Sequence, residues 1–280
     1  MNIKITSDST CDLSPELVEQ YTIGVIPIKI EKGEETYQDG FDIFPGDIFR
    51  HVDAGGELCK TAAINPTEYK AFFEQFSCHY DAVIHINLGS GFSSCYQNAC
   101  LAAKEYENVF VVDSKNLSSG QGLVVMEAAI KAKAGCSAKD ILEHLAYIVP
   151  RVRSSFLLNR LDYMVKGGRC TMVKALGADL LRLKPCIEVI DGRMVVGKKY
   201  RGSLQRCLVQ YVEERLFHTD NIASHRIFMT HTDINPEIPK SVIDKVAKKE
   251  FFDNIYETIA GCAVSCHCGQ NTLGILYIEK

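Results

Sequence analysis

Short apolar runs alternate with amphipathic segments up to about residue 150. The predicted strands cover residues 3–7, 23–30, 82–88 and 109–113, and the predicted helices cover residues 13–20, 66–76, 94–106 and 120–133. A loop-rich stretch separates residues 30 and 66. Strands that alternate with helices in this way favour a parallel sheet flanked by helices.

The pattern changes after residue 150. Two apolar runs, 186–190 and 194–200, are joined by Asp191-Gly192, a strong signal for a hairpin turn. Further helices are predicted over residues 161–166, 176–183, 204–217 and 240–249, and further strands over residues 224–230, 251–259 and 273–278. We therefore expect an α/β protein with two domains, a parallel-sheet domain over residues 1–150 and a mixed α/β domain over residues 151–280, with a ligand in the cleft between them.

A Gly/Ser-rich turn follows the third predicted strand. Gly89-Ser90-Gly91-Phe92-Ser93-Ser94 separates that strand from a helix-like segment that begins at Cys95. Such a turn directs backbone N–H groups, hydroxyls and the positive end of a helix dipole at one point, which suits a phosphate or a carboxylate. Residues 7–10 and 113–114 are also polar strand ends, where ligands bind in open parallel sheets. These features predict an anion site at the turn.

Missing motifs and modest charge narrow the possible ligands and partners. The chain lacks a G-x-x-x-x-G-K-[ST] motif, and Gly89-Ser90-Gly91 lacks the third glycine of a dinucleotide site, which disfavours nucleotide binding. A net charge of −4 without a basic block gives no electrostatic basis for binding nucleic acid. No apolar signal core and no run near the ~20 residues of a membrane span occurs, so we expect a cytoplasmic protein without a transmembrane segment.

The turn also permits an enzymatic interpretation. Residues 91–95 resemble the G-x-S-x-G elbow of serine hydrolases, with Cys95 in the position of the second glycine. An esterase would use Ser93 as its nucleophile, with Asp113 and either His231 or His267 as partners. A simpler alternative is that the serines only cap the helix that follows, because serine is a favoured N-cap residue.

Twelve cysteines raise the questions of disulfides and metal. Because the chain has no export signal, we interpret them as reduced thiols. Cys262, Cys266, His267 and Cys268 form the densest group of metal-ligand residues, but structural zinc normally needs a second pair of ligands elsewhere in the chain. We therefore expect no metal and keep a zinc module as the weakest alternative.

A series of short motifs follows in a fixed order along nearly the whole chain. They are Ser7-Asp8-Ser9-Thr10, Thr61 with Asn65-Pro66-Thr67, the loop over residues 89–99, Val112-Asp113-Ser114, Gly120-Gln121-Gly122, residues 161–169, Asp191-Gly192, Arg201, and a strand end at His267. In this order they resemble the DegV family, whose members include the fatty-acid-binding subunits of bacterial fatty acid kinase. Two departures are Ser94-Cys95, where the family has glycine after the serine, and Cys268-Gly269-Gln270-Asn271, where it has x-Gly-Pro-Gly.

The resemblance implies a protein that binds a long-chain fatty acid without catalysing a reaction and without a cofactor. The hydroxyls of Thr61 and Ser93 would hold the carboxylate, and Arg201 and His267 would lie nearby. Apolar residues over 176–181 and 187–196 would line a tunnel for the tail. A separate ATP-dependent kinase subunit would form the acyl phosphate, and lipid exchange would involve at most a transient contact with a membrane surface.

Overall fold

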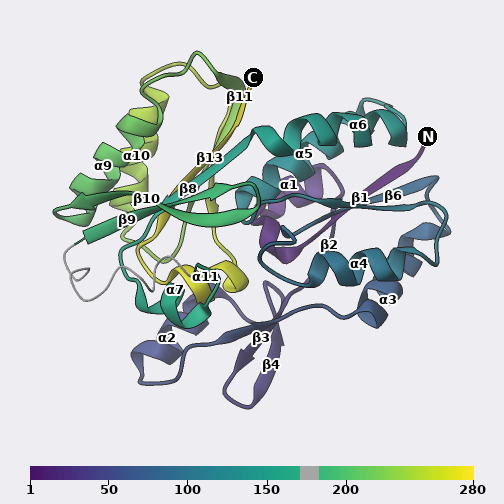
Figure 1. Cartoon of the computed structure of the whole chain (residues 1–280), viewed down its shortest axis with the longest axis horizontal. Coiled ribbons are helices and arrows are strands. Elements are labelled where there is room, and N and C mark those ends of the chain that lie inside the picture. Colours follow the sequence, from purple (N-terminus) through teal and green to yellow (C-terminus); the bar gives the residue numbers. More distant parts are fainter. Residues whose placement is uncertain (171–182) are drawn as a thin grey trace.

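The computed structural model describes residues 1–170 and 183–280 (Figure 1). Its first half contains β1 (Ile3–Asp8), η1 (Ser9–Cys11), α1 (Pro15–Gln20), β2 (Gly24–Ile26), β3 (Lys29–Lys32), β4 (Glu35–Gln38), α2 (Pro45–Asp53), β5 (Lys60–Ala62), α3 (Pro66–Ser77), β6 (Ala82–Asn87), α4 (Cys95–Ala103), β7 (Val109–Asp113), α5 (Ser119–Lys133), α6 (Ala138–Ile148) and η2 (Val149–Arg151). The strand predicted over residues 23–30 is two strands, because Pro27 interrupts it and has no N–H for the ladder. The loop-rich stretch contains β4, α2 and β5.

The second half contains the remaining described elements. They are β8 (Val152–Leu157), α7 (Asp162–Gly167), β9 (Leu183–Ile190), β10 (Arg193–Arg201), α9 (Leu204–Arg215), β11 (Ile222–His231), α10 (Glu237–Ala247), β12 (Ile255–Ile259), α11 (Cys262–Cys268) and β13 (Leu273–Glu279). The predicted strand end at His267 is wrong, since this residue lies in helix α11. Residues 176–182 of a predicted helix, and with them the predicted tunnel-lining residues 176–181, lie outside the described residues.

The described strands form three sheets. A parallel sheet has the order β2-β1-β6-β7, and a mixed sheet has the order β10-β9-β8-β13-β11-β12. A small antiparallel sheet has the order β4-β3-β5. The predicted α/β class, with a parallel sheet and a mixed sheet, is confirmed. The Asp191-Gly192 hairpin is confirmed too, and both residues have positive φ angles, as a type I′ turn requires.

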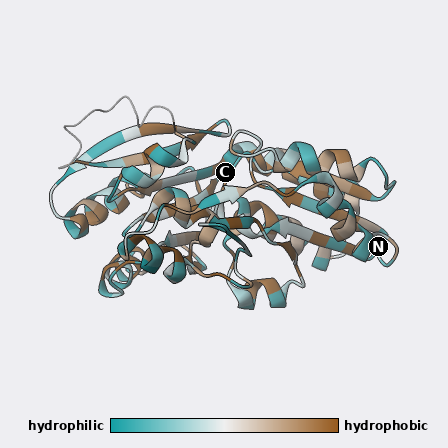
Figure 2. Ribbon diagram, turned by 90° about the horizontal axis from the view of Figure 1, so that it is seen from below, coloured by the Kyte–Doolittle hydropathy of each residue, from teal (hydrophilic) through white to brown (hydrophobic). Residues whose placement is uncertain are grey.

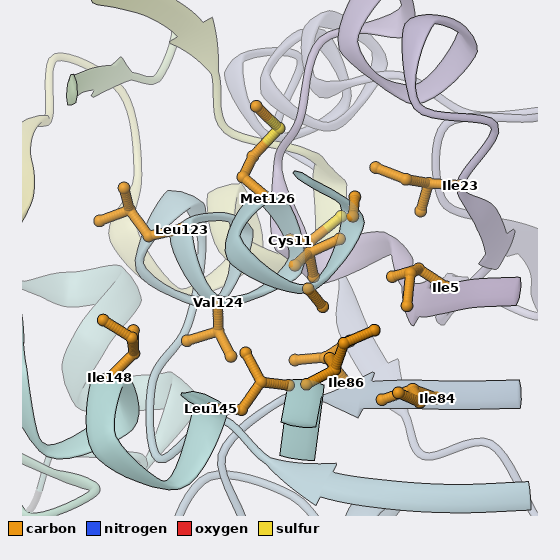
Figure 3. Close-up of a cluster of buried hydrophobic side chains, with 14 of the residues drawn as sticks. Ile5, Cys11, Ile23, Ile84, Ile86, Leu123, Val124, Met126, Leu145 and Ile148 are labelled. Carbon is orange, nitrogen blue, oxygen red and sulfur yellow. The ribbon is translucent and has the colours of Figure 1, made fainter. Parts of the chain in front are cut away.

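Helix α5 forms the centre of the largest core. Residues 119–129 are all buried, because the helix packs against β1 and β6 of the parallel sheet and against β8, β11 and β13 of the mixed sheet. Figure 3 shows its side chains Leu123, Val124 and Met126 among those of Ile84 and Leu145. A helix covered on nearly all sides needs apolar or small residues around most of its circumference, and α5 has them apart from Gln121 and Glu127, whose side chains are hydrogen-bonded. Exposed helices instead show hydrophobic and hydrophilic residues in alternation (Figure 2).

A second core joins segments that are far apart in the sequence. Helices α2, α3 and α4 contribute to it together with neighbouring strands and loops, and Tyr163 of α7 and Cys262, Ala263 and Cys266 of α11 belong to it as well. Figure 1 shows α7 and α11 next to each other near α2. The C-terminal helix α11 is therefore packed against elements from the early part of the chain, and the boundary at residue 150 stays a prediction.

Candidate functional site

A cavity of about 140 Å³ lies between β5, the Gly/Ser turn and α11. Its polar lining residues are Thr10, Thr61, Ser93, Ser94, Arg169 and His267. The other lining residues are apolar or sulfur-containing and include Ile28, Leu88, Phe92, Leu117, Met194 and Val264. The structure thus brings together Thr61, Ser93 and His267 of the predicted site residues, although they come from three segments that are well separated in the sequence.

Two of these residues, Thr61 and His267, are hydrogen-bonded to each other. The Oγ1 atom of Thr61 and the Nε2 atom of His267 share a hydrogen bond of 3.1 Å. Burial, aided by the positive charge of Arg169, lowers the pKa of His267 to about 4, so the imidazole is neutral at neutral pH. Its Nδ1 atom has no hydrogen-bond partner among the described residues, and Gly167 covers it so closely that a Cβ there would lie 2.3 Å away.

The position of His267 depends on how α11 is held. The carboxylate of Asp39 accepts hydrogen bonds from the backbone N–H groups of Cys262, at 2.7 Å, and Ala263, at 3.2 Å. Asp12 accepts a third, from Gly261 at 2.8 Å. These bonds satisfy the free donors at the start of the helix. They partly oppose the effect of burial, which raises the pKa of Asp39 and raises that of Asp12 to about 8. Both carboxylates come from the N-terminal part of the chain, which explains why the sequence around residue 262 did not predict the helix.

Ser93 lies in the turn before α4 and has weak partners. Its hydroxyl donates to the Cys95 sulfur at 3.2 Å and accepts from the Cys95 N–H at 3.3 Å. Since sulfur is a weak acceptor, this hydroxyl can turn to a ligand at little cost. The turn itself is fixed, because Asp113 accepts hydrogen bonds from both the N–H and the hydroxyl of Ser90, at 3.0 and 2.5 Å.

The β9–β10 hairpin closes over this turn. The Gly192 carbonyl oxygen would lie 2.2 Å from a Cβ on Gly91, so only glycine permits this approach. The contact brings Met194 to the cavity, but it leaves Arg201 at the opposite end of β10, where its side chain is exposed. Arg201 is not among the described residues that line the cavity, whereas Arg169 is. Arg169 is the last residue of the sequence motif over residues 161–169.

Buried polar groups support the floor of the cavity. Asp8 is fully buried and accepts hydrogen bonds from the Leu88 N–H at 2.8 Å and from the side chains of Asn87 and Gln121, each at 3.1 Å. Burial raises the pKa of Asp8, although these bonds oppose the shift. Thr10, which lines the cavity, donates to Gln121 at 2.8 Å. The polar residues at the end of β1 therefore form a buried hydrogen-bond network behind the cavity, and Thr10 is the one of them that lines the cavity.

The partners that an esterase would need are engaged elsewhere. Asp113 is bonded to Ser90, as described above, and His231 is not among the described residues that line the cavity. His267 lines the cavity but forms its hydrogen bond with Thr61 instead of Ser93. A Ser–His–Asp relay through Ser93 is therefore not assembled from these residues.

Two further findings concern metals and membranes. Within residues 1–170 and 183–280, no group of three or more His, Cys, Asp or Glu side chains is arranged to hold a metal ion. None of the helices in the same residues combines the length and the apolar character needed to cross a bilayer.

Sequence comparison relates the whole chain to one family. Residues 2–280 match the family described as "Uncharacterised protein, DegV family". A DegV domain-containing protein of Clostridium perfringens is 31% identical over 284 residues, covering 99% of this chain and 99% of the relative. A DegV domain-containing protein of Clostridium acetobutylicum is 29% identical over 282 residues, again covering 99% of each.

Solved structures with the same fold include proteins that bind fatty acids. DegV of Bacillus subtilis, described as a fatty acid binding protein, is 28% identical with a TM-score of 0.86, covering 100% of both chains. A stearic acid-binding protein of Eubacterium ventriosum is 26% identical with a TM-score of 0.86, covering 99% of this chain and 98% of that one. A DegV family protein of Thermus thermophilus, at 23% identity and a TM-score of 0.91 over the full length of both chains, shares the fold. Because both sequence and fold agree over its whole length, the chain belongs to the DegV family.

Proposed function

We propose that this chain binds a long-chain fatty acid, with the carboxylate at Thr61, Ser93 and His267 and the tail entering along the apolar part of the cavity. The observation that carries the proposal is that two hydroxyls and a neutral imidazole, from three separate segments, line one cavity whose other walls are mostly apolar. Solved relatives that bind fatty acids support the choice of ligand.

The polar end has the donors that a carboxylate requires. A carboxylate removed from water must be hydrogen-bonded or paired with a cation. Thr61 and Ser93 supply hydroxyl donors, and both have exchangeable partners. Since His267 is neutral, the nearest cationic lining residue is Arg169. We propose that Arg169 balances the charge of the carboxylate, in the place near the head group that the resemblance implied for Arg201.

The apolar walls supply most of the binding energy in this proposal. Transfer of each methylene group out of water contributes about 0.8 kcal/mol, so a long tail outweighs the polar contacts. Met194 comes from the predicted tunnel-lining run 187–196 and does line the cavity. Phe92, Leu88 and Val264 extend the apolar surface from the other side.

We further propose that the chain acts in the cytoplasm as a non-catalytic subunit that presents the acid to an ATP-dependent kinase. A second cavity of about 660 Å³ shares Thr61, Arg169 and His267 with the first, which supports access to the carboxylate end from outside. Phosphoryl transfer needs a nucleotide and a metal. The sequence contains no phosphate-binding loop of the Walker type, so a separate enzyme would supply both.

Native mass spectrometry of the purified protein tests the ligand assignment. We expect a stoichiometric mass increment that organic extraction identifies as a fatty acid, and its loss in the Thr61→Ala/Ser93→Ala variant. The variant loses one hydrogen bond at Thr61 and two long ones at Ser93, each worth about 1 kcal/mol, so it should remain folded. Thr67→Ala, at an exposed threonine outside the cavity, is the matched control and should retain lipid.

Two outcomes would contradict this proposal. Full lipid occupancy in the folded double variant would show that the carboxylate lies elsewhere, and failure of the wild-type chain to take up any member of a fatty acid series would exclude the ligand class. Presentation is tested separately, by formation of acyl phosphate only when the loaded chain, ATP and a bacterial fatty acid kinase are combined.

A further inference from the structure

Two thiols lie directly behind the Thr61–His267 pair. Cys59 immediately precedes β5, close to Thr61, and Cys266 is the neighbour of His267 in α11. Both side chains belong to the same buried core cluster, and the pKa of each thiol responds to the other. Both are buried, with exposed fractions of 5% and 3%, yet both line the open 660 Å³ cavity and are within reach of small solutes. None of the described cysteines is in a disulfide.

The two thiols differ in acidity. The hydrogen bond from Cys266, aided by the positive charge of Lys32, lowers the pKa of Cys59 to about 7. The same bond, together with burial, raises the pKa of Cys266. Cys59 is therefore the more acidic thiol of the two, and Cys266 is the thiol that keeps its proton. Buried thiols without such a partner behave differently, since burial raises the pKa of Cys11 and of Cys268 to about 12.

We propose that Cys59 and Cys266 form a peroxide-reactive pair that closes to a disulfide beside the head-group site. The Cys59 thiolate attacks one oxygen of hydrogen peroxide, the O–O bond breaks, and the other oxygen leaves as water after taking up a proton. The resulting sulfenic acid is attacked by the Cys266 sulfur, which loses its proton as the S–O bond breaks and a second water leaves. Two thiols are oxidised by two electrons, and one peroxide is reduced to two waters.

The pair has the arrangement that such a reaction requires. A redox-sensitive thiol is acidic and accessible and has a resolving thiol next to it. Cys59 meets these conditions through its lowered pKa, the open cavity and its contact with Cys266. The disulfide would tie the start of β5 to α11, immediately beside the hydrogen-bonded pair of Thr61 and His267. This inference concerns the thiols alone, so it can fail or succeed independently of the fatty acid proposal.

Peptide mapping of the whole reduced protein after brief exposure to hydrogen peroxide tests the pair. We expect one disulfide, between the peptides that contain Cys59 and Cys266, before any other cysteine is oxidised. In Cys266→Ser the sulfenic acid should persist at Cys59 and be captured by dimedone, whereas Cys59→Ser should give neither product. Cys78→Ser, which removes an exposed thiol, is the control and should behave like wild type.

Other results would overturn the proposal. Oxidation of Cys78 ahead of Cys59 would show that exposure, and not the contact with Cys266, determines reactivity. A disulfide that joins Cys59 to a different cysteine would remove the assigned resolving role. Circular dichroism of each variant establishes that it is folded, and the dimedone capture in Cys266→Ser gives a second readout that does not depend on disulfide formation.

Discussion

Replacing Gly167 with alanine tests whether the position of His267 matters for binding. The new Cβ would lie 2.3 Å from Nδ1 of the imidazole, whereas ordinary contacts begin near 3.4 Å, so the ring or the end of α7 must move by about 1.1 Å. Gly167 is not among the residues with positive φ, so the strain comes from this contact and not from the backbone. The ring cannot move that far and keep its 3.1 Å bond to Thr61.

The expected magnitudes follow from this displacement. Overpacking of a well-packed site costs about 1–3 kcal/mol of folding stability. Loss of an aligned hydrogen bond to a carboxylate costs about 1.5–3 kcal/mol, which corresponds to roughly ten- to hundredfold weaker binding. Thermal unfolding measures the first effect, and calorimetric titration of the delipidated protein with a fatty acid measures the second.

Matched variants separate the contact from the substitution itself. Gly46→Ala makes the same change in α2, where the nearest atom is the flexible end of Arg50 at 3.2 Å, and should leave binding unchanged. Gly167→Ala/His267→Ala removes the clash and should regain stability but not affinity. If Gly167→Ala and Gly167→Ala/His267→Ala both bind with wild-type affinity while folded, the imidazole plays no part in holding the carboxylate and our reasoning about the site is wrong.

Three further predictions concern charge and packing. Arg169→Ala should weaken fatty acid binding about tenfold or more in the same titration, whereas Arg201→Ala should leave it unchanged. The reverse result would show that Arg201, and not Arg169, lies at the carboxylate. Burial alone would raise the pKa of Glu127, but its contacts with the side chains of His225, Arg226 and His144 lower it to about 2. Because the pKa is depressed in the folded state, ionised Glu127 contributes to the free energy of unfolding above about pH 4.5, and this contribution is lost as the pH falls toward 2. In urea unfolding, Glu127→Gln should reduce the fall of the unfolding free energy over this pH range by about 3 kcal/mol. The same fall in the variant as in the wild type would contradict the assignment. Leu123→Ala, in the buried helix α5, should cost about 2–5 kcal/mol by urea unfolding, against little for Leu101→Ala at a side chain that is 53% exposed; equal losses would contradict the central place of α5.

The sequence pattern predicted those strands and turns that are specified by residues next to each other in the chain. The strand over residues 109–113 was predicted at its observed bounds, and Asp191-Gly192 turns where its residue types require. Strand β4 was missed because it is short and mostly exposed, so it has no apolar alternation to recognise. Helix α11 was missed because its cap, Asp39, lies near the opposite end of the chain from the N–H groups that it binds.

For the site residues too, those in local motifs were predicted, and the one that depends on contacts between distant segments was not. Thr61 and Ser93 belong to motifs beside strands and turns, and the cavity contains both. The choice between Arg169 and Arg201 instead depends on how the β9–β10 hairpin lies over the turn. Met194 is at the cavity, and Arg201 follows it along a strand that rises about 3.3 Å per residue, which takes it roughly 20 Å away. Nothing in the sequence of the hairpin determines which of its ends faces the ligand.

The last strand of the chain is an inner strand of its sheet. β13 pairs with β8 on one side and β11 on the other, and α11, just before it, carries His267. During synthesis, at about 5–20 residues per second, Thr61 would wait on the order of 10–40 s before residue 267 is made. A nascent chain can therefore display the Gly/Ser turn and β5 but not the complete head-group site. Under the proposed function, lipid capture would require that residue 267 has been translated and α11 has folded, so a product interrupted before that residue would compete poorly for lipid.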